Sequence, residues 1–188
     1  MSDNPRVTTS ASGQGARRGA QVLARLRERP PALWYQGELV RDVTVHPALR
    51  AGVHSLAALY DLQWQQPEQS LFTSPTSGRP VARSFMIPKT QSELRSITRA
   101  MQIWQQYTHG MMGRAPDYLN RALSAFAGGA AFFSEADPRF GQNAVRQHEY
   151  LREHDLCLTH SVVTPQSNRA VNAARQADPY LAARSRQS

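Results

Sequence analysis

Four stretches of the sequence repeat apolar residues at the spacing of an α-helix, and this periodicity constrains the fold most strongly. The stretches cover about residues 46–66, 90–104, 116–133 and 137–154. Apolar residues three and four apart share one helix face, so each stretch predicts an amphipathic helix packed on a core. Thr90 followed by Glu93 has the spacing of a capping box, which predicts where the second helix begins. The sequence therefore predicts a mainly α-helical fold.

Three of these helices carry specific expectations about packing. The apolar face of the second is expected to consist of Leu94, Ile97, Met101 and Trp104. The inward residues of the fourth are expected to be Phe140, Ala144, His148 and Leu151. Residues 125–131 of the third helix are uncharged and mostly Ala or Gly. Small side chains let backbones approach closely, so another element is expected to pack against this stretch.

Shorter elements fill the remaining sequence. They are a basic helix over 17–29, a hairpin over 33–40, a loop-like segment over 71–88 with an extended piece at 85–87, and an extended segment at 156–163. Residues 1–16 are rich in Ser, Thr and Gly, which is typical of a disordered tail. The predicted organisation is a tail over 1–16, a helical domain over 17–155 and an extended segment from 156 to 188.

The net charge of +8 is concentrated at the two ends of the chain. Residues 1–30 carry six Arg against two acidic residues, and residues 166–188 carry four Arg against one. The body between them is nearly neutral, so a specific nucleic-acid face on the folded part is not predicted. A weak electrostatic attraction to nucleic acid or acidic partners stays open.

Cysteine and histidine usage argues against disulfides and metal sites. Cys157 is the single cysteine, so no disulfide can form within the chain. His148 and His154, with Glu149 and Glu153, have no convincing spacing for a metal site, and none is predicted. No apolar run approaches the roughly 20 residues of a membrane span, and the N-terminus lacks an apolar signal core. These features predict a cytoplasmic protein that does not enter a membrane.

Residues 110–118 place a glycine-containing loop next to a helix start. Pro116 suits the first helical turn, where its missing N–H costs nothing, and the Asp117 carboxylate suits the positive helix end. Arg114 and Tyr118 are four residues apart and share a face if this turn is helical. Two interpretations are open at this point. The pair binds an anion or a phenolic oxygen, or it is an arginine at a helix start beside a packed tyrosine.

Three separated blocks of sequence form a recognisable pattern. They are Pro-Thr-Ser-Gly at 75–78 with Ser-Phe-Met-Ile-Pro at 84–88, Met-Gly-Arg-Ala-Pro-Asp-Tyr at 112–118, and Asp-Leu-Cys-Leu-Thr-His at 155–160 followed by Pro165-Gln166. Their order and spacing resemble the N-terminal region of the 4-hydroxyphenylacetate 3-monooxygenase oxygenase-component family, which includes pyoverdine-chromophore and chlorophenol hydroxylases. The resemblance runs from about residue 18 to Leu181.

This resemblance implies a fold similar to acyl-CoA dehydrogenases, with an N-terminal helical domain, a central β-domain and a C-terminal helical bundle. Residues 17–155 would form the helical domain, and residues 156–188 the start of the β-domain. The family hydroxylates phenols such as 4-hydroxyphenylacetate ortho to the hydroxyl group, using oxygen and reduced FAD. The implied partners are therefore a phenolic substrate and a separate flavin reductase, with FAD as cofactor and no metal.

The resemblance also implies roles for individual residues. Arg114, Tyr118 and His160 match the trio that binds the phenolic oxygen. An arginine favours the phenolate, whose ortho carbon is the better nucleophile, and a histidine can accept a proton near neutral pH. Without the resemblance, His160 would be interpreted as a hydrogen-bonded structural histidine. The implied flavin-contacting residues are His160, Ser161, Val162, Val163, Gln166, Ser167, Asn168 and Arg169.

Family members are more than twice the length of this chain, so the central β-domain and the helical bundle are expected to be missing from it. This difference leaves an alternative open, a truncated non-catalytic helical fragment or a partner module of a full-length paralogue. Which phenol is the substrate also stays open. The apolar segment 156–163 would offer an unpaired edge, which makes a homo-oligomer possible.

Overall fold

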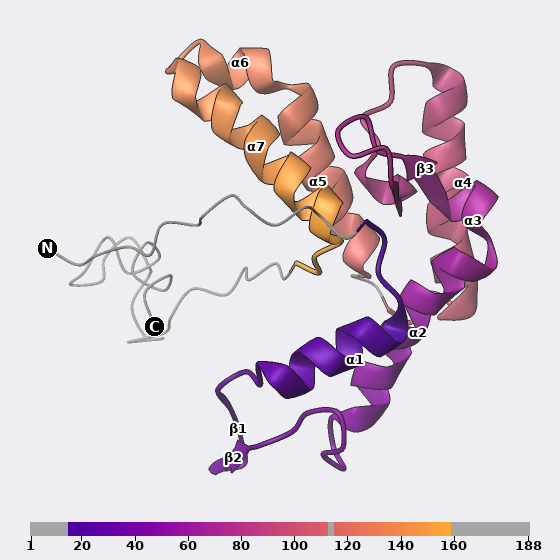
Figure 1. Cartoon of the computed structure of the whole chain (residues 1–188), viewed down its shortest axis with the longest axis vertical. Helices are drawn as coiled ribbons and strands as arrows, with labels where there is room; N and C mark the ends of the chain where they lie inside the picture. The colour runs from indigo at the N-terminus through magenta and orange to yellow at the C-terminus, as the bar shows by residue number, and fades with distance from the viewer. Residues whose placement is uncertain (1–14, 113–114, 159–188) are drawn as a thin grey trace, which may run out of the picture. The chain divides into compact units, whose positions relative to one another are not determined.

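The computed structural model describes residues 15–112 and 115–158 of the chain, and Figure 1 shows its elements. The helices of these ranges are α1 (Gly19–Glu28), α2 (Arg50–Gln65), α3 (Pro67–Ser70), the 3-10 helix η1 (Arg83–Phe85), α4 (Gln91–Tyr107), α5 (Pro116–Gly128), α6 (Ala130–Ser134) and α7 (Pro138–His154). The strands are β1 (Leu33–Tyr35), β2 (Glu38–Val40), β3 (Leu71–Thr73) and β4 (Pro80–Ala82), paired as two separate antiparallel hairpins. The predicted mainly α-helical fold is confirmed.

The four predicted helices are present, but the third is divided in two. Its stretch forms α5 and α6, which meet at Gly129, because two consecutive glycines favour a helix end and the Gly129 N–H turns back to the Ala125 carbonyl oxygen. The capping box at the start of α4 is confirmed. The Glu93 N–H donates to Thr90 Oγ1 at 3.1 Å, and the Thr90 N–H donates to Glu93 Oε2 at 3.0 Å.

Residues 71–88 are more regular than the predicted loop. β3 and β4 pair with Leu71 opposite Ala82, and the turn formers between them make the hairpin turn. The Ser74 N–H donates to the Arg79 carbonyl oxygen at 2.8 Å to close that turn. Phe85 ends η1, so the predicted extended piece begins one residue later, at Met86. The prediction was wrong here because strands of three residues are too short to show alternating hydrophobicity.

The N-terminal elements follow the prediction more closely. The hairpin of β1 and β2 is confirmed, and its two turn residues Gln36 and Gly37 have φ angles of 51° and 86°. Helix α1 begins at Gly19, two residues later than expected. A Cβ at Gly19 would lie 2.5 Å from the Ala57 carbonyl oxygen, so α1 and α2 approach closely there. Residues 1–14 of the predicted tail lie outside the described residues.

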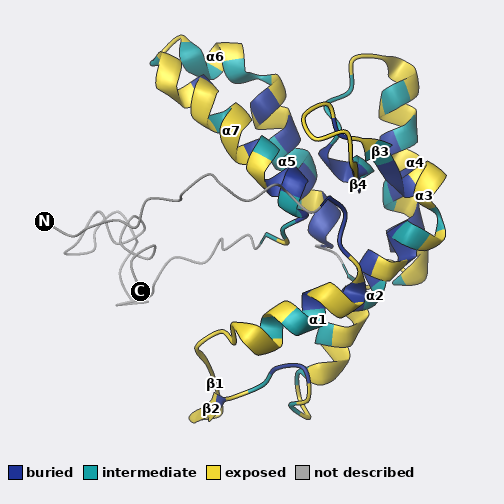
Figure 2. Ribbon diagram, in the orientation of Figure 1, coloured by how far each residue is buried: buried dark blue, intermediate teal, exposed yellow. Residues whose placement is uncertain are grey.

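The described residues form two buried apolar clusters. Figure 2 shows buried positions of the ribbon in dark blue. The first cluster consists of Leu59, Leu62, Ile103, Trp104 and Ala115, with Leu56 and Met112 packed against it. The second consists of Ala82, Phe85 and Leu151, with Leu123, Leu156 and Leu158 packed against it. The described part of the predicted extended segment, residues 156–158, has no strand, and both its leucines lie against the second cluster.

The predicted inward residues are partly correct. Ile97 and Trp104 of α4 are buried, as are His148 and Leu151 of α7. Leu94 and Phe140 are 50% and 54% exposed, so these two assignments were wrong. Both residues lie in the first turn of their helices, where Figure 2 shows mostly exposed positions. Helical periodicity identifies the apolar face of a helix but not the point at which its neighbour stops covering it.

Residues 15–17 are held against the end of α7 by buried hydrogen bonds. The Arg17 N–H donates to Asp155 Oδ2 at 2.8 Å, and Arg17 Nε donates to the Asp155 carbonyl oxygen at 2.7 Å. Gln63 of α2 donates through Nε2 to both the Arg17 carbonyl oxygen and Asp155 Oδ2, each at 2.9 Å. We call Arg17, Gln63 and Asp155 the terminal clamp. The clamp joins the first and last parts of the described chain to α2.

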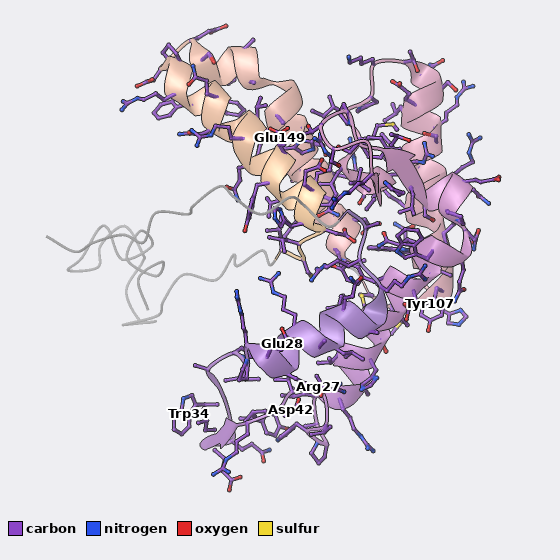
Figure 3. All side chains as sticks on the ribbon, in the orientation of Figure 1. Arg27, Glu28, Trp34, Asp42, Tyr107 and Glu149 are labelled. Carbon is purple, nitrogen blue, oxygen red and sulfur yellow. The ribbon has the colours of Figure 1, made fainter. Side chains whose placement is uncertain are left out.

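The β3–β4 turn is fixed onto α7 by a second polar cluster. Ser74 Oγ and Ser77 Oγ each donate to the Glu153 carboxylate at 2.5 Å, and Arg152 Nε donates to the same carboxylate at 2.7 Å. Thr76 donates to Glu149, which Figure 3 labels on α7. The first sequence block, at 75–78, therefore has a structural role in the described chain. No helix of the described residues is long and apolar enough to span a bilayer.

The predicted close approach near residues 125–131 involves Gly141 of α7. A Cβ at Gly141 would lie 2.3 Å from the Ala130 carbonyl oxygen and 2.1 Å from Ser134 Oγ, both on α6. Gly141→Ala is expected to lower the free energy of unfolding by about 1–3 kcal/mol, because the helices must move apart. Urea unfolding followed by circular dichroism measures this change.

Gly52→Ala is the matched control, because a Cβ there would meet nothing within 4 Å. It lies inside α2 and is expected to raise the free energy of unfolding by up to about 1 kcal/mol through helix propensity. Equal effects of the two substitutions would contradict the close packing of α6 and α7.

Candidate functional site

The start of α5 lies where the sequence predicts it. Pro116 occupies the first helical position after the N-cap residue Ala115. Asp117 and Tyr118 complete the first turn but differ in environment. Asp117 is buried, whereas Tyr118 is 44% exposed and is therefore accessible to a ligand. This turn presents a tyrosine at the surface while a neighbouring carboxylate lies in the interior.

The chain between α4 and α5 is anchored up to Met112. The Gly110 N–H donates to the Gln105 carbonyl oxygen at 2.9 Å, and the His109 N–H donates to the Gln106 carbonyl oxygen at 3.2 Å. His109 has a φ angle of 50°, so these bonds form a Schellman motif that ends α4. Met112 then packs on the first apolar cluster. The described part of the glycine-containing loop is therefore held at Gly110 by a hydrogen bond and at Met112 by apolar packing.

A polar stripe on α5 ties this helix to the segment after β4. The stripe consists of Asp117, Asn120, Arg121 and Ser124, at helical spacing. Asn120 Nδ2 donates to Ser84 Oγ at 2.9 Å. Arg121 Nη1 donates to the carbonyl oxygens of Ser84 and Met86 at 2.8 and 2.6 Å. The Arg121 bonds satisfy two carbonyl oxygens, and all three bonds join the sequence block at 84–88 to α5, the helix in which the block at 112–118 ends.

His148 completes this buried polar region from α7. Its Nε2 donates to the Phe85 carbonyl oxygen at 2.9 Å and lies 3.2 Å from Ser124 Oγ. A carbonyl oxygen only accepts, so Nε2 must carry the proton. Burial lowers the pKa of His148, which favours the neutral ring. His148 is therefore a structural histidine, and the described residues contain no group of three potential metal ligands.

Asp117 is the most perturbed carboxylate of the α5 start. Burial raises its pKa from the ordinary 3.8 to about 6, although the backbone N–H groups of Tyr118 and of Asp117 itself oppose the shift. The expected placement of this carboxylate at the positive helix end is confirmed. Desolvation nevertheless outweighs the helix dipole, because the side chain is only 5% exposed. Near neutral pH this carboxylate exists partly in the protonated form.

Of the predicted phenol-binding trio, the structure describes Tyr118. Arg114 and His160 lie outside the described residues, as do the predicted flavin-contacting residues Ser161, Val162, Val163, Gln166, Ser167, Asn168 and Arg169. Their placement on one side of the domain stays a prediction. The polar stripe on α5 was not predicted, although its side chains recur at helical spacing among residues that are otherwise mostly apolar or small. This periodicity in the sequence could have predicted a polar face on α5.

Residues 18–187 match the family model described as 4-hydroxyphenylacetate 3-hydroxylase, N terminal. The chain belongs to this family. The family expected from the three sequence blocks is therefore confirmed, and the match covers nearly the whole chain.

Two relatives are oxygenase components of 4-hydroxyphenylacetate 3-monooxygenase. The chain is 45% identical over 163 residues to the protein of Geobacillus sp. (strain PA-9), covering 87% of this chain and 33% of that protein. It is 43% identical over 166 residues to the protein of Thermus thermophilus, covering 88% of this chain and 34% of that protein. The chain thus spans about a third of the length of these relatives.

Solved structures support the same fold. The chain matches a crystal structure of the oxygenase component of 4-hydroxyphenylacetate 3-monooxygenase, complexed with FAD and 4-hydroxyphenylacetate, with a TM-score of 0.78 and 42% identity. This match covers 88% of the chain and 34% of that structure. An archaeal 4-hydroxybutyryl-CoA dehydratase matches with a TM-score of 0.72 at 20% identity, which concerns the fold alone. The expected fold of the N-terminal helical domain is confirmed, over about a third of each of these solved chains.

The raised pKa of Asp117 predicts how stability depends on pH. A carboxyl whose pKa is higher in the folded state stabilises the fold below its ordinary pKa, and this contribution is lost as pH rises through the folded-state value. For Asp117 the window runs from about pH 4 to about pH 6. The expected loss is at most about 3 kcal/mol of unfolding free energy, from a shift of about two pKa units.

Asp117→Asn removes this titration while keeping the size of the side chain. The variant is expected to match the wild type near pH 4 and to be more stable by up to about 3 kcal/mol near pH 7. Urea unfolding of both proteins across this range measures the difference. The low pKa of His148 destabilises both proteins equally as pH falls, so it cancels in the comparison. A difference that does not change with pH would contradict the buried Asp117.

Proposed function

We propose that this chain forms the N-terminal part of the oxygenase component of a two-component monooxygenase that depends on reduced FAD. The reaction is the hydroxylation of a phenol, such as 4-hydroxyphenylacetate, ortho to its hydroxyl group. The family match over residues 18–187 supports this function, together with a similar solved structure complexed with FAD and 4-hydroxyphenylacetate. Because the chain spans about a third of its relatives, the activity belongs to the longer protein of which this segment would be a part.

The exposed Tyr118 on a firmly held helix start is the structural observation that carries the proposal. Hydrogen bonds from Asn120 and Arg121 fix α5 to the segment after β4, and Met112 fixes the approach to it from α4. A tyrosine hydroxyl group that orients a substrate needs such a rigid support, because small displacements of a positioning group greatly lower the reaction rate. The Tyr118 side chain lies on the accessible side of this support.

Arg114, Tyr118 and His160 would act together on the phenolic oxygen. The Arg114 guanidinium keeps its charge and favours the phenolate form of the substrate. Tyr118 orients the same oxygen through a hydrogen bond, and His160 accepts the phenolic proton. These roles rest on the matching positions of the family motif, together with the surface position of Tyr118.

The flavin would be held by residues that follow α7. They are His160, Ser161, Val162, Val163, Gln166, Ser167, Asn168 and Arg169, all outside the described residues. When bound, reduced FAD would supply the electrons that activate molecular oxygen for the hydroxylation. A separate flavin reductase would provide the reduced cofactor, as the name oxygenase component of the relatives suggests. A cytoplasmic location and a homo-oligomeric state also stay predictions.

Tyr118→Phe tests the site in a protein that joins this segment to the remaining two thirds of a family member. The variant is expected to raise the Kd for 4-hydroxyphenylacetate by about fivefold to tenfold, because one hydrogen bond to the phenolic oxygen is lost. Its Kd for reduced FAD is expected to stay at the wild-type value. Anaerobic calorimetric titration measures both constants.

Tyr107→Phe is the matched control, because Tyr107 lies at the end of α4 and is half exposed (Figure 3). It is expected to leave both affinities unchanged. In the same protein, Arg114→Ala is expected to depress hydroxylation further than Tyr118→Phe while flavin binding persists. Wild-type phenol affinity in Tyr118→Phe, or near wild-type hydroxylation in Arg114→Ala, would overturn the assignment.

A second titration distinguishes an active domain from a non-catalytic module. A polypeptide of these 188 residues alone offers flavin contacts from one segment, at 160–169. If half the binding free energy of a micromolar ligand is lost, about −4 kcal/mol remains, which corresponds to millimolar affinity. We expect weak or undetectable binding of reduced FAD and no catechol after mixing with oxygen and 4-hydroxyphenylacetate. Micromolar binding with catechol formation would make the segment a minimal monooxygenase.

A further inference from the structure

A small polar cavity lies beside the first turn of α5. Its volume is about 10 Å³, which is close to the space that one water molecule occupies. Its polar walls are Gln63 of α2, Ser70 of α3, Ser84 of η1 and Asp117 of α5. Ala100 and Trp104 of α4 contribute to the apolar walls. The cavity therefore lies where α2, α3, η1 and α4 meet the start of α5.

Three of the polar walls carry a buried atom with no hydrogen-bond partner among the described residues. These atoms are Gln63 Oε1, Ser70 Oγ and Asp117 Oδ2. Their residues are 1%, 5% and 5% exposed, so bulk solvent does not reach them. A buried polar atom without a partner costs about 1–3 kcal/mol. Three such atoms around one cavity of this volume point to a shared polar ligand.

The orientation of the Gln63 amide is fixed by its other bonds. Nε2 donates to the Arg17 carbonyl oxygen and to Asp155 Oδ2, each at 2.9 Å. Arg17 offers only an accepting oxygen there, so the amide cannot be reversed without losing that bond. Oε1 is consequently the atom that is available to the cavity. It can only accept a hydrogen bond, which restricts the ligand to a donor.

We propose that this cavity is a binding site for one internal water molecule, held by Gln63, Ser70 and Asp117. The water donates one hydrogen to Gln63 Oε1 and the other to the Asp117 carboxylate, and it accepts the Ser70 hydroxyl hydrogen. When Asp117 is protonated, its carboxyl group donates to the water instead. Either arrangement gives the water three hydrogen bonds, the usual number for buried water. All three atoms then have a partner.

The water connects the terminal clamp to the start of α5. Gln63 belongs to the clamp, and Asp117 precedes Tyr118 in the first turn of α5, where the Tyr118 N–H donates to the Ala115 carbonyl oxygen at 3.0 Å. The bridge therefore holds the turn that carries Tyr118, which makes Asp117 a positioning residue for that tyrosine. The proposal concerns the fold of this chain and stands independently of the proposed monooxygenase activity.

A double-mutant cycle on the full chain tests the bridge. At pH 4, where Asp117 is largely protonated in the folded state, Ser70→Ala and Asp117→Ala are each expected to raise the unfolding equilibrium constant about tenfold, since each leaves partners unsatisfied. The double variant is expected to raise it by much less than the hundredfold product, because both substitutions remove the same water. The two residues do not bond to each other in the structure, so a fully additive result would overturn the proposal.

Ser124→Ala is the matched control for this cycle. Ser124 of α5 is buried, as Ser70 of α3 is. Its hydroxyl donates to the Asn120 carbonyl oxygen at 2.7 Å, and Ser124 does not line the cavity. Ser70→Ala and Ser124→Ala are expected to act additively. Hydrogen exchange at the Tyr118 amide is expected to speed up in Ser70→Ala and to stay unchanged in Ser124→Ala. Equal exchange rates in the two variants would contradict the positioning role.

A crystal structure of the unmodified chain tests the proposal without relying on the effect of a substitution. At a resolution that places ordered waters, electron density for one water is expected within hydrogen-bonding distance of Gln63 Oε1, Ser70 Oγ and Asp117 Oδ2. A direct hydrogen bond between Ser70 and Asp117, or a cavity without density, would overturn the proposal even if the double variant fails to fold.

Discussion

The fold of the described chain depends on one buried polar contact, the terminal clamp. Arg17 and Asp155 are separated by 138 positions in the sequence, yet the Arg17 backbone N–H donates to the Asp155 carboxylate in the interior. Burial raises the pKa of Asp155, and the donors of Arg17 and Gln63 oppose that shift. A buried carboxylate is tolerated only when such donors surround it. The clamp thereby fixes where α7 ends.

The polar residues of α5 apply the same principle to the candidate site. Hydrogen bonds in the interior add little net stability when they are made, but they are costly when they are missing. The bonds from Asn120 and Arg121 to residues 84–86 therefore allow few alternative positions for α5. An apolar interface of the same size would tolerate sliding more readily. This geometric specificity is what a helix start that orients a substrate oxygen requires.

The described residues thus explain how the domain holds the turn that carries Tyr118, and the proposed chemistry would also need residues outside the described ranges. The first and second sequence blocks meet through Ser84 and α5, and the third begins at Asp155 of the clamp. Each of these motifs therefore contributes to, or lies next to, buried hydrogen bonds between segments that are far apart in the sequence. Tyr118 lies at the surface on the same helix as the buried bonds of Asn120.

The sequence by itself determined the elements whose signals are local. Periodicity predicted α2, α4 and α7, the capping box located the start of α4, and the three blocks identified the family. Tyr118 could be named from its motif alone, and Arg114 and His160 stay predictions of the same kind. Tertiary structure alone decided that Asp117, Asn120 and Ser124 are buried. Polar residues usually face solvent, and their burial depends on partners such as Ser84 and His148, which lie 24 or more positions away. Local propensity carries no information about such partners, because it reports only the preference of neighbouring residues.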